Sequence, residues 1–188
     1  MPEVKKPVRS LAEVLMEIDS QSKKLFFSNW GVDALDDEDA TSAKNKTSVI
    51  TQLVVEGRRL LFTGDAGITA LSHALDNMVW SSQLAQWALI QIPHHGSRRN
   101  VGPTILNRLV GTPLPPGMTR NVFAVVSTAS KGDPKHPYKA VMNALTHRGV
   151  NAMATRGKTT RYAYNAPCRW GWNAVVSDQY YWVYEDEK

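Results

Sequence analysis

The chain has 188 residues, 43% of them hydrophobic, with a formal net charge of +5 and one cysteine. This length suits a single domain with a substantial core, and one cysteine excludes both an internal disulfide and a four-cysteine zinc site. Because no apolar run approaches the roughly 18 residues needed to cross a bilayer, we expect a cytoplasmic protein without a membrane span. The basic excess suits an anionic substrate or nucleic acid, but ordinary surface charge explains it equally well.

Residues 1–44 are expected to form an N-terminal tail, a short helix and an acidic loop. Ser10 and Glu13 match a capping box ahead of apolar residues at helical spacing, which predicts a helix over about 11–20. Leu25–Phe27 is predicted to form a short strand. Residues 33–44 are polar and acidic but lack the central glycine and terminal glutamate of a calcium-binding EF-hand, so a solvated loop is expected.

From residue 45 to 165, strands and helices are predicted to alternate, which favours an α/β arrangement. Two strands flanking Gly57 indicate a hairpin, and the later strands are apolar enough for a covered sheet. The predicted strands are 48–56, 58–63, 88–92, 122–127, 150–155 and 161–164, and the predicted helices are 67–77, 103–110 and 137–148. Residues 166–188 form an aromatic C-terminal extension, in which 170–184 should add an edge strand or a covering hairpin. The lone Cys168 is expected to be a small buried hydrophobe rather than a nucleophile.

Three successive predicted strands are followed by residues that can bind a metal ion. Asp65 follows the second strand, His94 and His95 follow the third, and His136 lies between the fourth strand and its helix. Active sites of α/β proteins gather at such strand ends, although Asp65 could instead cap the following helix. Adjacent histidines point to opposite sides of an extended chain, so one is expected to bind metal and the other to orient it, contact substrate or cap the turn. His73 and His147 fall within helices and are expected to be structural or solvent-facing.

These residues lie in motifs that resemble the C-terminal half of the metallo-β-lactamase superfamily, over about residues 45–165. The resemblance is to the branch that contains the hydrolase domain of DNA-uptake competence-channel proteins. The motifs, in chain order, are Asn45-Lys46-Thr47-Ser48-Val49, Leu60–Asp65 (LLFTGD), Ile92–Ser97 (IPHHGS), Val125–Thr128 (VVST), Lys135-His136-Pro137, and Thr155–Gly157. LLFTGD followed some 30 residues later by IPHHGS is the most specific part of the match.

The resemblance implies an αββα sandwich with a site for one or two Zn²⁺ ions, or Mn²⁺, at its edge. Asp65 would bridge the metals and His95 or His94 would complete the second. His95 is favoured because Gly-Ser follows it. The implied reaction is metal-assisted hydrolysis of a phosphodiester or carbonyl substrate, with nucleic acid as one candidate. His136, Ser97, Arg98 and Asn45 would contact substrate, and Arg98, Arg99 and Lys135 suit a phosphate.

The principal metal motif of that superfamily, His-x-His-x-Asp-His, is absent, because no histidine precedes His73. Three hypotheses follow. The chain supplies the second half of a hydrolase whose first half lies on the same precursor or on another chain; it is a non-catalytic scaffold or binding module for protein or nucleic acid; or two copies complement each other as a homodimer. In each case we expect an apolar sheet face that promotes association.

Overall fold

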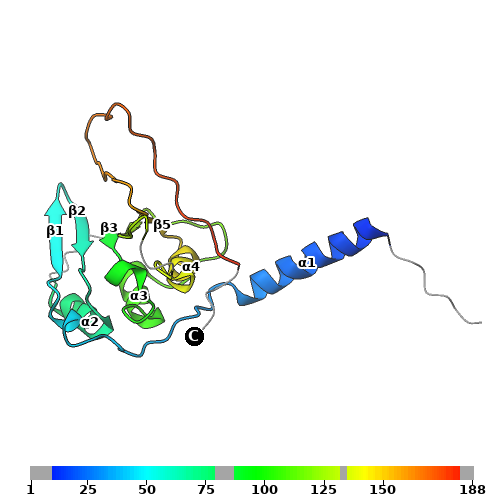
Figure 1. The fold of residues 1–188 in the computed structure, drawn as a ribbon, viewed down its shortest axis with the longest axis horizontal. Coiled ribbons are helices and arrows are strands. Elements are labelled where there is room, and N and C mark those ends of the chain that lie inside the picture. Colours follow the sequence, from blue (N-terminus) through cyan, green and yellow to red (C-terminus); the bar gives the residue numbers. More distant parts are fainter. Residues whose placement is uncertain (1–9, 79–86, 132–134, 183–188) are drawn as a thin grey trace, which may run out of the picture.

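The computed structural model describes residues 10–78, 87–131 and 135–182 and shows a mixed α/β fold around a five-stranded sheet (Figure 1). The α-helices are α1 (Leu11–Asn29), α2 (Ile68–Asn77), α3 (Pro103–Val110) and α4 (Lys139–His147). The strands are β1 (Thr51–Val55), β2 (Arg58–Phe62), β3 (Trp87–Gln91), β4 (Phe123–Val126) and β5 (Asn151–Ala154), and two short 3₁₀ helices are η1 (Asn45–Thr47) and η2 (His94–Gly96). None of the helices in these ranges is both long and apolar enough to cross a membrane.

The strands lie in the order β1-β2-β3-β4-β5. β1 and β2 form an antiparallel hairpin that turns at Glu56 and Gly57, both with positive φ, as a two-residue turn of this kind requires. β2, β3, β4 and β5 are parallel, and α3 and α4 follow β3 and β4 in the chain. The carboxyl ends of these four strands therefore meet at one edge of the sheet. The predicted hairpin, α/β alternation and all three predicted helices in this region are confirmed, with shifts of one to three residues at most ends.

One face of the sheet is covered by helices and the other is largely open. The covered face presents Leu61, Ile90, Ala124, Val126 and Ala152, which form a common core with apolar residues of α2, α3 and α4. Their alternation with more exposed neighbours on β4 and β5 is the period-2 pattern of a sheet with unequal faces. On the open face, Leu53 is 45% exposed and Phe123 is 42% exposed.

A segment after β5, residues 157–177, crosses part of this open face; we refer to it as the C-terminal strap. The ring centre of Tyr162, in the strap, lies 6.1 Å from that of Phe123. The guanidinium of Arg58 donates to the Tyr162 hydroxyl at 3.2 Å. The strap contains no strand, and none occurs in residues 178–182 either, so the predictions of a strand at 161–164 and of β structure from residue 170 to 182 are wrong. Residues 183–184 lie outside the described part. Cys168 is exposed, which corrects its predicted burial.

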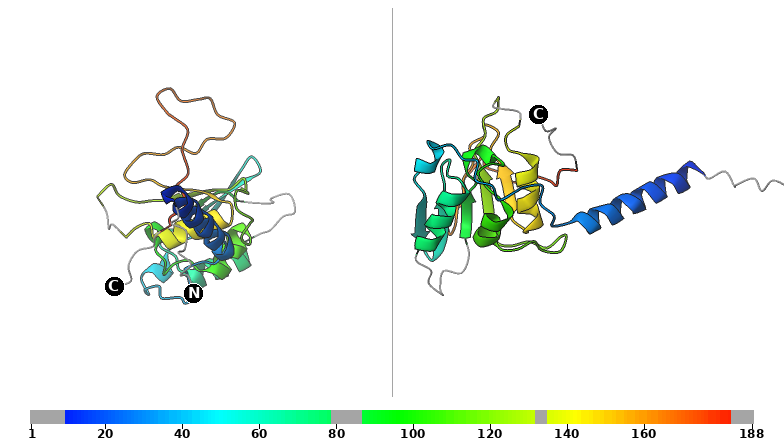
Figure 2. Two further views of the ribbon diagram at one scale, coloured as in Figure 1. Left: turned by 90° about the vertical axis from the view of Figure 1, so that its right-hand side faces the viewer. Right: turned by 90° about the horizontal axis from the view of Figure 1, so that it is seen from below.

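The N-terminal region differs most from the prediction. α1 begins at the predicted capping box, where Ser10 Oγ accepts from the Glu13 amide at 3.2 Å and the Glu13 carboxylate accepts from the Ser10 amide at 2.8 Å. The helix then continues to Asn29, so the predicted strand at 25–27 is wrong, and α1 extends away from the rest of the molecule (Figures 1 and 2). Short-range apolar character alone does not separate a strand from a helix that is already nucleated.

The acidic loop packs onto the N-termini of two helices. Asp39 accepts from the Thr69 amide at 3.2 Å in the first turn of α2, and Asp37 accepts from the amide and hydroxyl of Thr104 in the first turn of α3. The loop comes so close that a Cβ on Gly67, the N-cap residue of α2, would lie 2.0 Å from the Thr41 hydroxyl. Carboxylates complement the unpaired amides and the positive end of a helix. The loop is largely exposed, as predicted, but two of its carboxylates also bind helix N-termini.

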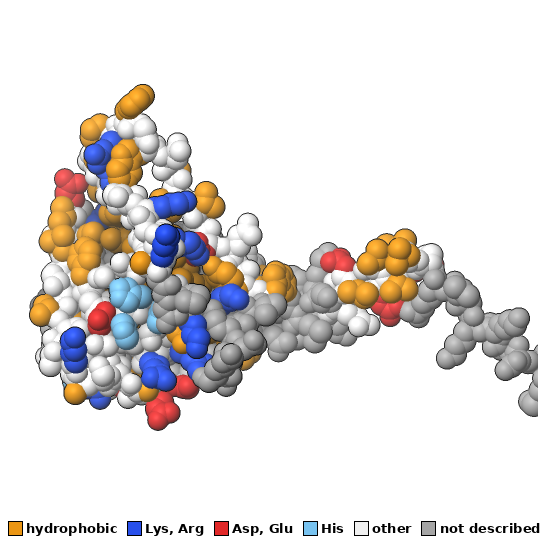
Figure 3. All heavy atoms as spheres, in the orientation of Figure 1, with side chains coloured by type: hydrophobic (Ala, Val, Ile, Leu, Met, Phe, Trp, Pro, Cys, Tyr) orange, Lys and Arg blue, Asp and Glu red, His pale blue; other side chains and the backbone are white. Residues whose placement is uncertain are grey.

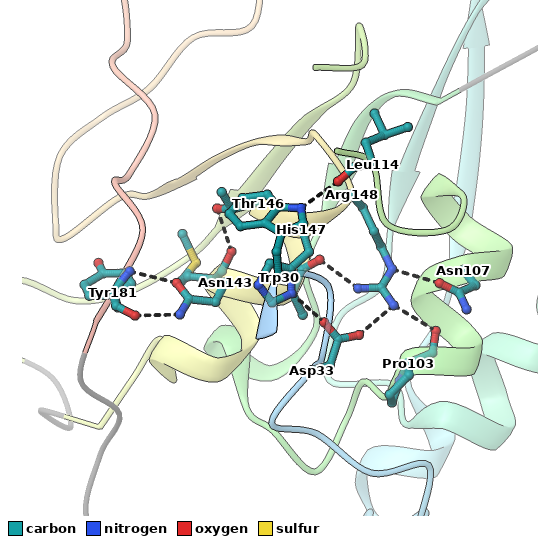
Figure 4. A network of polar contacts seen from close by, with 12 residues as sticks. Trp30, Asp33, Pro103, Asn107, Leu114, Asn143, Thr146, His147, Arg148 and Tyr181 are labelled. Carbon is teal, nitrogen blue, oxygen red and sulfur yellow. Dashed lines mark hydrogen bonds and ion pairs between the residues drawn. The ribbon is translucent and has the colours of Figure 1, made fainter. Parts of the chain in front are cut away.

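Asp33 of the same loop joins a buried polar network with the C-terminal end of α4 (Figure 4). Its carboxylate accepts from His147 Nδ1 at 2.9 Å and pairs with Arg148 at 2.7 Å, and the three side chains are at most 4% exposed. Trp30 adds a hydrogen bond from its indole nitrogen to the Leu114 carbonyl at 2.6 Å. Burial alone raises the pKa of Asp33, but the hydrogen bonds and charges of His147 and Arg148 outweigh it, so the pKa lies below its ordinary value.

Candidate functional site at the strand ends

The structure brings the predicted strand-end residues together at one edge of the sheet. His94 and His95 lie in η2 directly after β3, and His136 lies between β4 and α4. The ring centres of His94 and His95 are 6.0 Å apart, those of His94 and His136 are 6.2 Å apart, and those of His95 and His136 are 6.4 Å apart. Figure 3 shows histidine side chains gathered on the surface of the molecule next to an acidic side chain.

Gly96 allows the two histidine-bearing segments to approach. Its φ is +77°, and a Cβ at this position would lie 2.7 Å from the Pro137 Cβ, so a side chain would clash with the loop that carries His136. The Gly96 carbonyl accepts from the Tyr138 amide at 3.1 Å. On the other side, the His94 amide donates to the Gly64 carbonyl at 3.1 Å, which fixes η2 against the end of β2. The glycine of the His-His-Gly sequence is thus required by packing as well as by backbone conformation.

Asn100 connects the Asp65 segment to His94. Its Nδ2 donates to the carbonyls of Asp65 at 2.9 Å and of Ala66 at 3.2 Å, and its Oδ1 lies 3.0 Å from His94 Nδ1. Asn45 also reaches His94, with its Nδ2 3.5 Å from Nδ1. The sequence motifs point to Asn45 but not to Asn100, because nothing in the spacing of an asparagine after Arg98-Arg99 marks it as buried.

The hydrogen bonds assign the protonation of both imidazoles. His95 Nδ1 lies 2.6 Å from the Ser127 carbonyl, which can only accept, so Nδ1 carries the proton. Asn100 donates through Nδ2 to two carbonyls, which leaves Oδ1 as the acceptor for His94 Nδ1. This contact is shorter than that of Asn45 Nδ2, which can only donate and therefore makes no hydrogen bond to a protonated Nδ1. Each neutral ring therefore presents an unprotonated Nε2, the form in which histidine binds metal ions, and its ring orientation is held from behind.

The backbone at this turn adopts an unusual conformation. His94 has φ +46° and His95 has φ +57°, so two consecutive side-chain-bearing residues occupy the left-handed region. Each such residue costs on the order of 1–3 kcal/mol and persists where the surroundings enforce it, often at functional sites. Such strain is therefore consistent with a turn whose side chains have a function.

Asp65 does not cap the helix that follows it. α2 starts at Ile68 with Gly67 as its N-cap residue, and the carboxylate that accepts a hydrogen bond from its first turn is that of Asp39. The Asp65 amide donates to Ser48 Oγ at 3.2 Å, while its carboxylate has no hydrogen-bond partner among the described residues. The capping interpretation of Asp65 is wrong, and its half-buried carboxylate is left for another role.

Ser97, Arg98 and Lys135 were also predicted to contact the substrate or its phosphate. Ser97 is buried, and its hydroxyl accepts from the Arg99 amide at 3.3 Å, so its observed contact stabilises the turn. Arg98 is half-buried, with its guanidinium 5.5 Å from the ring centre of Tyr138, and Lys135 is exposed in the His136 loop. His73 is exposed on α2, and His147 is buried with Asp33, as expected for residues outside the site.

These side chains do not by themselves make a complete metal site. Within the described ranges, no group of three or more His, Cys, Asp or Glu side chains is arranged to hold a metal ion. A catalytic zinc needs three protein ligands and an open position. No family model matches the chain, and no curated protein or solved structure was found to match it.

Proposed function

We propose that this chain supplies one part of a metal-dependent hydrolase of the metallo-β-lactamase superfamily, a phosphodiesterase or nuclease. The observation that carries the proposal is the convergence of Asp65, His94, His95 and His136 at the carboxyl ends of three neighbouring parallel strands, with the histidine rings 6.0–6.4 Å apart. Unrelated structural roles do not require these residue types at three successive strand ends.

The site supports metal binding through its chemistry rather than through a finished geometry. Imidazole Nε2 and carboxylate oxygen are the donors that Zn²⁺ accepts, and Mn²⁺ tolerates the same set. Asp65, His95 and His94 would contribute these donors, with Ser127 and Asn100 holding the two rings. Since these three side chains are too few for a complete metal site, the remaining ligands would come from a polypeptide that carries His-x-His-x-Asp-His.

The open sheet face supports the same proposal. In an αββα sandwich a second sheet would cover the face on which Leu53, Phe62 and Phe123 are now exposed. That second sheet would come from the partner half of the fold, on the same precursor or on another chain.

A phosphodiester substrate fits the charge around the site. Arg98, Arg99 and Lys135 lie in the two loops that carry the histidines, and guanidinium groups bind phosphate oxygens in a bidentate manner. Their role would be to hold the anionic group beside the strand ends, with Asn45 and His136 as further contacts.

The test is co-expression of the chain with any polypeptide encoded beside it that carries His-x-His-x-Asp-His, followed by hydrolysis of bis(p-nitrophenyl) phosphate with added zinc or manganese. We expect activity from the pair, loss of at least a hundredfold with Asp65→Ala or His95→Ala, and no change with the control His73→Ala on the exposed face of α2. Full activity of the Asp65→Ala pair would refute the proposal.

The alternative is a non-catalytic scaffold or binding module, which the incomplete donor set favours. It predicts no hydrolysis from any pairing and a folded chain whose stability and partners do not change when Asp65 is replaced.

A further inference from the structure

The C-terminal strap carries cationic and aromatic side chains and no acidic one. The strap itself combines three cationic side chains with four aromatic ones: Lys158, Arg161 and Arg169, with Tyr162, Tyr164, Trp170 and Trp172. Figure 1 shows it projecting from the body, and Figure 3 shows basic and hydrophobic side chains mixed on this projection.

The two ends of the strap are held together at its base. Arg156 pairs with Asp178 through two hydrogen bonds of 2.9 and 2.7 Å, which tie the two ends together. The Gly157 amide donates to the Thr128 carbonyl at 2.8 Å, and the Asp178 amide donates to the Ala152 carbonyl at 2.8 Å. The acidic group nearest the strap is therefore already neutralised by its own partner.

Three of its four aromatic rings are exposed, and two of these lie beside guanidinium groups. Trp170 is 98% exposed, so both faces of its indole are open to a stacking partner. Arg169 lies 4.7 Å from the ring centre of Trp172, and Arg58 lies 3.5 Å from that of Tyr164. A ring with a cation on one face keeps its other face for stacking.

The space inside the strap is concave and cationic. A cavity of about 590 Å³ is lined by Lys158, Arg161 and Trp172, together with the already paired Arg156 and Asp178. Cations that follow a groove together with aromatic platforms are the two components by which proteins bind single-stranded nucleic acid without reading its sequence. A polynucleotide backbone can follow such a concave cationic groove, whereas the flat surface of a bilayer cannot enter it.

We infer that the C-terminal strap binds single-stranded nucleic acid, with phosphates against Lys158 and Arg161 and unpaired bases stacked on Trp170 and Trp172. This surface lies outside the strand-end site. Binding requires neither a metal ion nor hydrolysis, so it stands or falls separately from the proposed hydrolase.

The experiment is fluorescence anisotropy of a fluorescein-labelled oligo(dT) 20-mer titrated with the whole chain in EDTA at 50 mM salt. We expect Trp170→Ala and Trp172→Ala each to weaken binding about tenfold, and Trp170→Phe to retain most of it, because a phenyl ring still stacks. The matched control is Trp182→Ala, an exposed tryptophan outside the strap. Lys158→Ala with Arg161→Ala should reduce the slope of log affinity against log salt by about 1.4, which Lys44→Ala should not.

Three outcomes would overturn the inference: no binding of the oligonucleotide, equal loss with Trp182→Ala, or binding of a duplex as tight as of the single strand. Binding to vesicles of anionic phospholipid without binding to the oligonucleotide would assign the strap to membranes instead. Since Trp170 is almost fully exposed, its replacement should leave the fold intact, and the circular dichroism spectrum of each variant is to be compared with that of the wild type.

Discussion

Replacing Asp33 with asparagine should destabilise the fold by about 3–5 kcal/mol, the cost of leaving a buried charge without its partner. Arg148 is 1% exposed, and its other hydrogen bonds go to uncharged oxygens of Asn107, Ala144 and Pro103 at 2.8–3.4 Å. Asparagine keeps the size of Asp33 but removes its negative charge. The guanidinium would then be buried among neutral groups only.

Urea unfolding followed by circular dichroism measures this loss. Glu38→Gln is the control, because it removes a negative charge from the same loop at an exposed position and should change stability by less than about 0.5 kcal/mol. Combining Asp33→Asn with Arg148→Met should recover much of the loss, because no charge then remains buried without a partner.

The dependence on pH follows from the lowered pKa of Asp33. A carboxyl group whose pKa is depressed by folding contributes its full stability above its unfolded pKa of about 4 and loses it as pH falls through the lower folded value. The difference in unfolding free energy between wild type and Asp33→Asn should therefore shrink as the pH falls below about 4. A loss under 1 kcal/mol at pH 7, or an equal loss with Glu38→Gln, would refute the reasoning.

Three further predictions concern the helix cap, the histidine turn and the open face. Asp39→Ala should cost about 1–2 kcal/mol of unfolding free energy at pH 7, measured by urea unfolding. Burial raises the pKa of Asp39, but hydrogen bonds from Thr41 and Thr69 outweigh it and lower the pKa to about 2, so the loss should fade between pH 4 and 2. An undiminished loss at pH 2 would be inconsistent with this. His95→Gly should be more stable than His95→Ala by about 1 kcal/mol, since both lack the imidazole and glycine tolerates φ +57°; equal thermal stability would mean that the turn is unstrained. Leu53→Lys should reduce self-association of the isolated chain in light scattering, whereas Met118→Lys, in an exposed loop, should not; a monomeric wild type would contradict it.

The predictable part of the fold was the part with strong local periodicity. Helix α3 starts and ends where the sequence predicts, because Pro103 and Gly111 mark its two ends. The hairpin at Gly57 and the apolar strands β3 and β4 were equally clear. The strap could not be predicted, since its aromatic and β-branched residues are typical of strands, yet they contact the sheet face and solvent rather than a neighbouring strand.

At the candidate site, the sequence predicted which residues meet but not how they are held. The strand ends identified Asp65, His94, His95 and His136 because parallel strands place their carboxyl ends together. The contacts of Ser127 with His95, of Asn100 with Asp65 and of Asp39 with Thr69 join residues 30 to 35 positions apart in the chain. Such contacts follow from packing, which no local pattern encodes.

The most direct test of the central claim is calorimetric titration of Zn²⁺ into the purified chain and its variants. We predict weak zinc binding, with a dissociation constant of about micromolar or above. This binding should be lost in Asp65→Ala and His95→Ala and kept in His73→Ala. Tight stoichiometric zinc on the chain alone would show a complete site, and weak binding unaffected by the first two variants would show that these residues are not its donors. Either result would contradict the claim that this chain holds one part of a shared metal site.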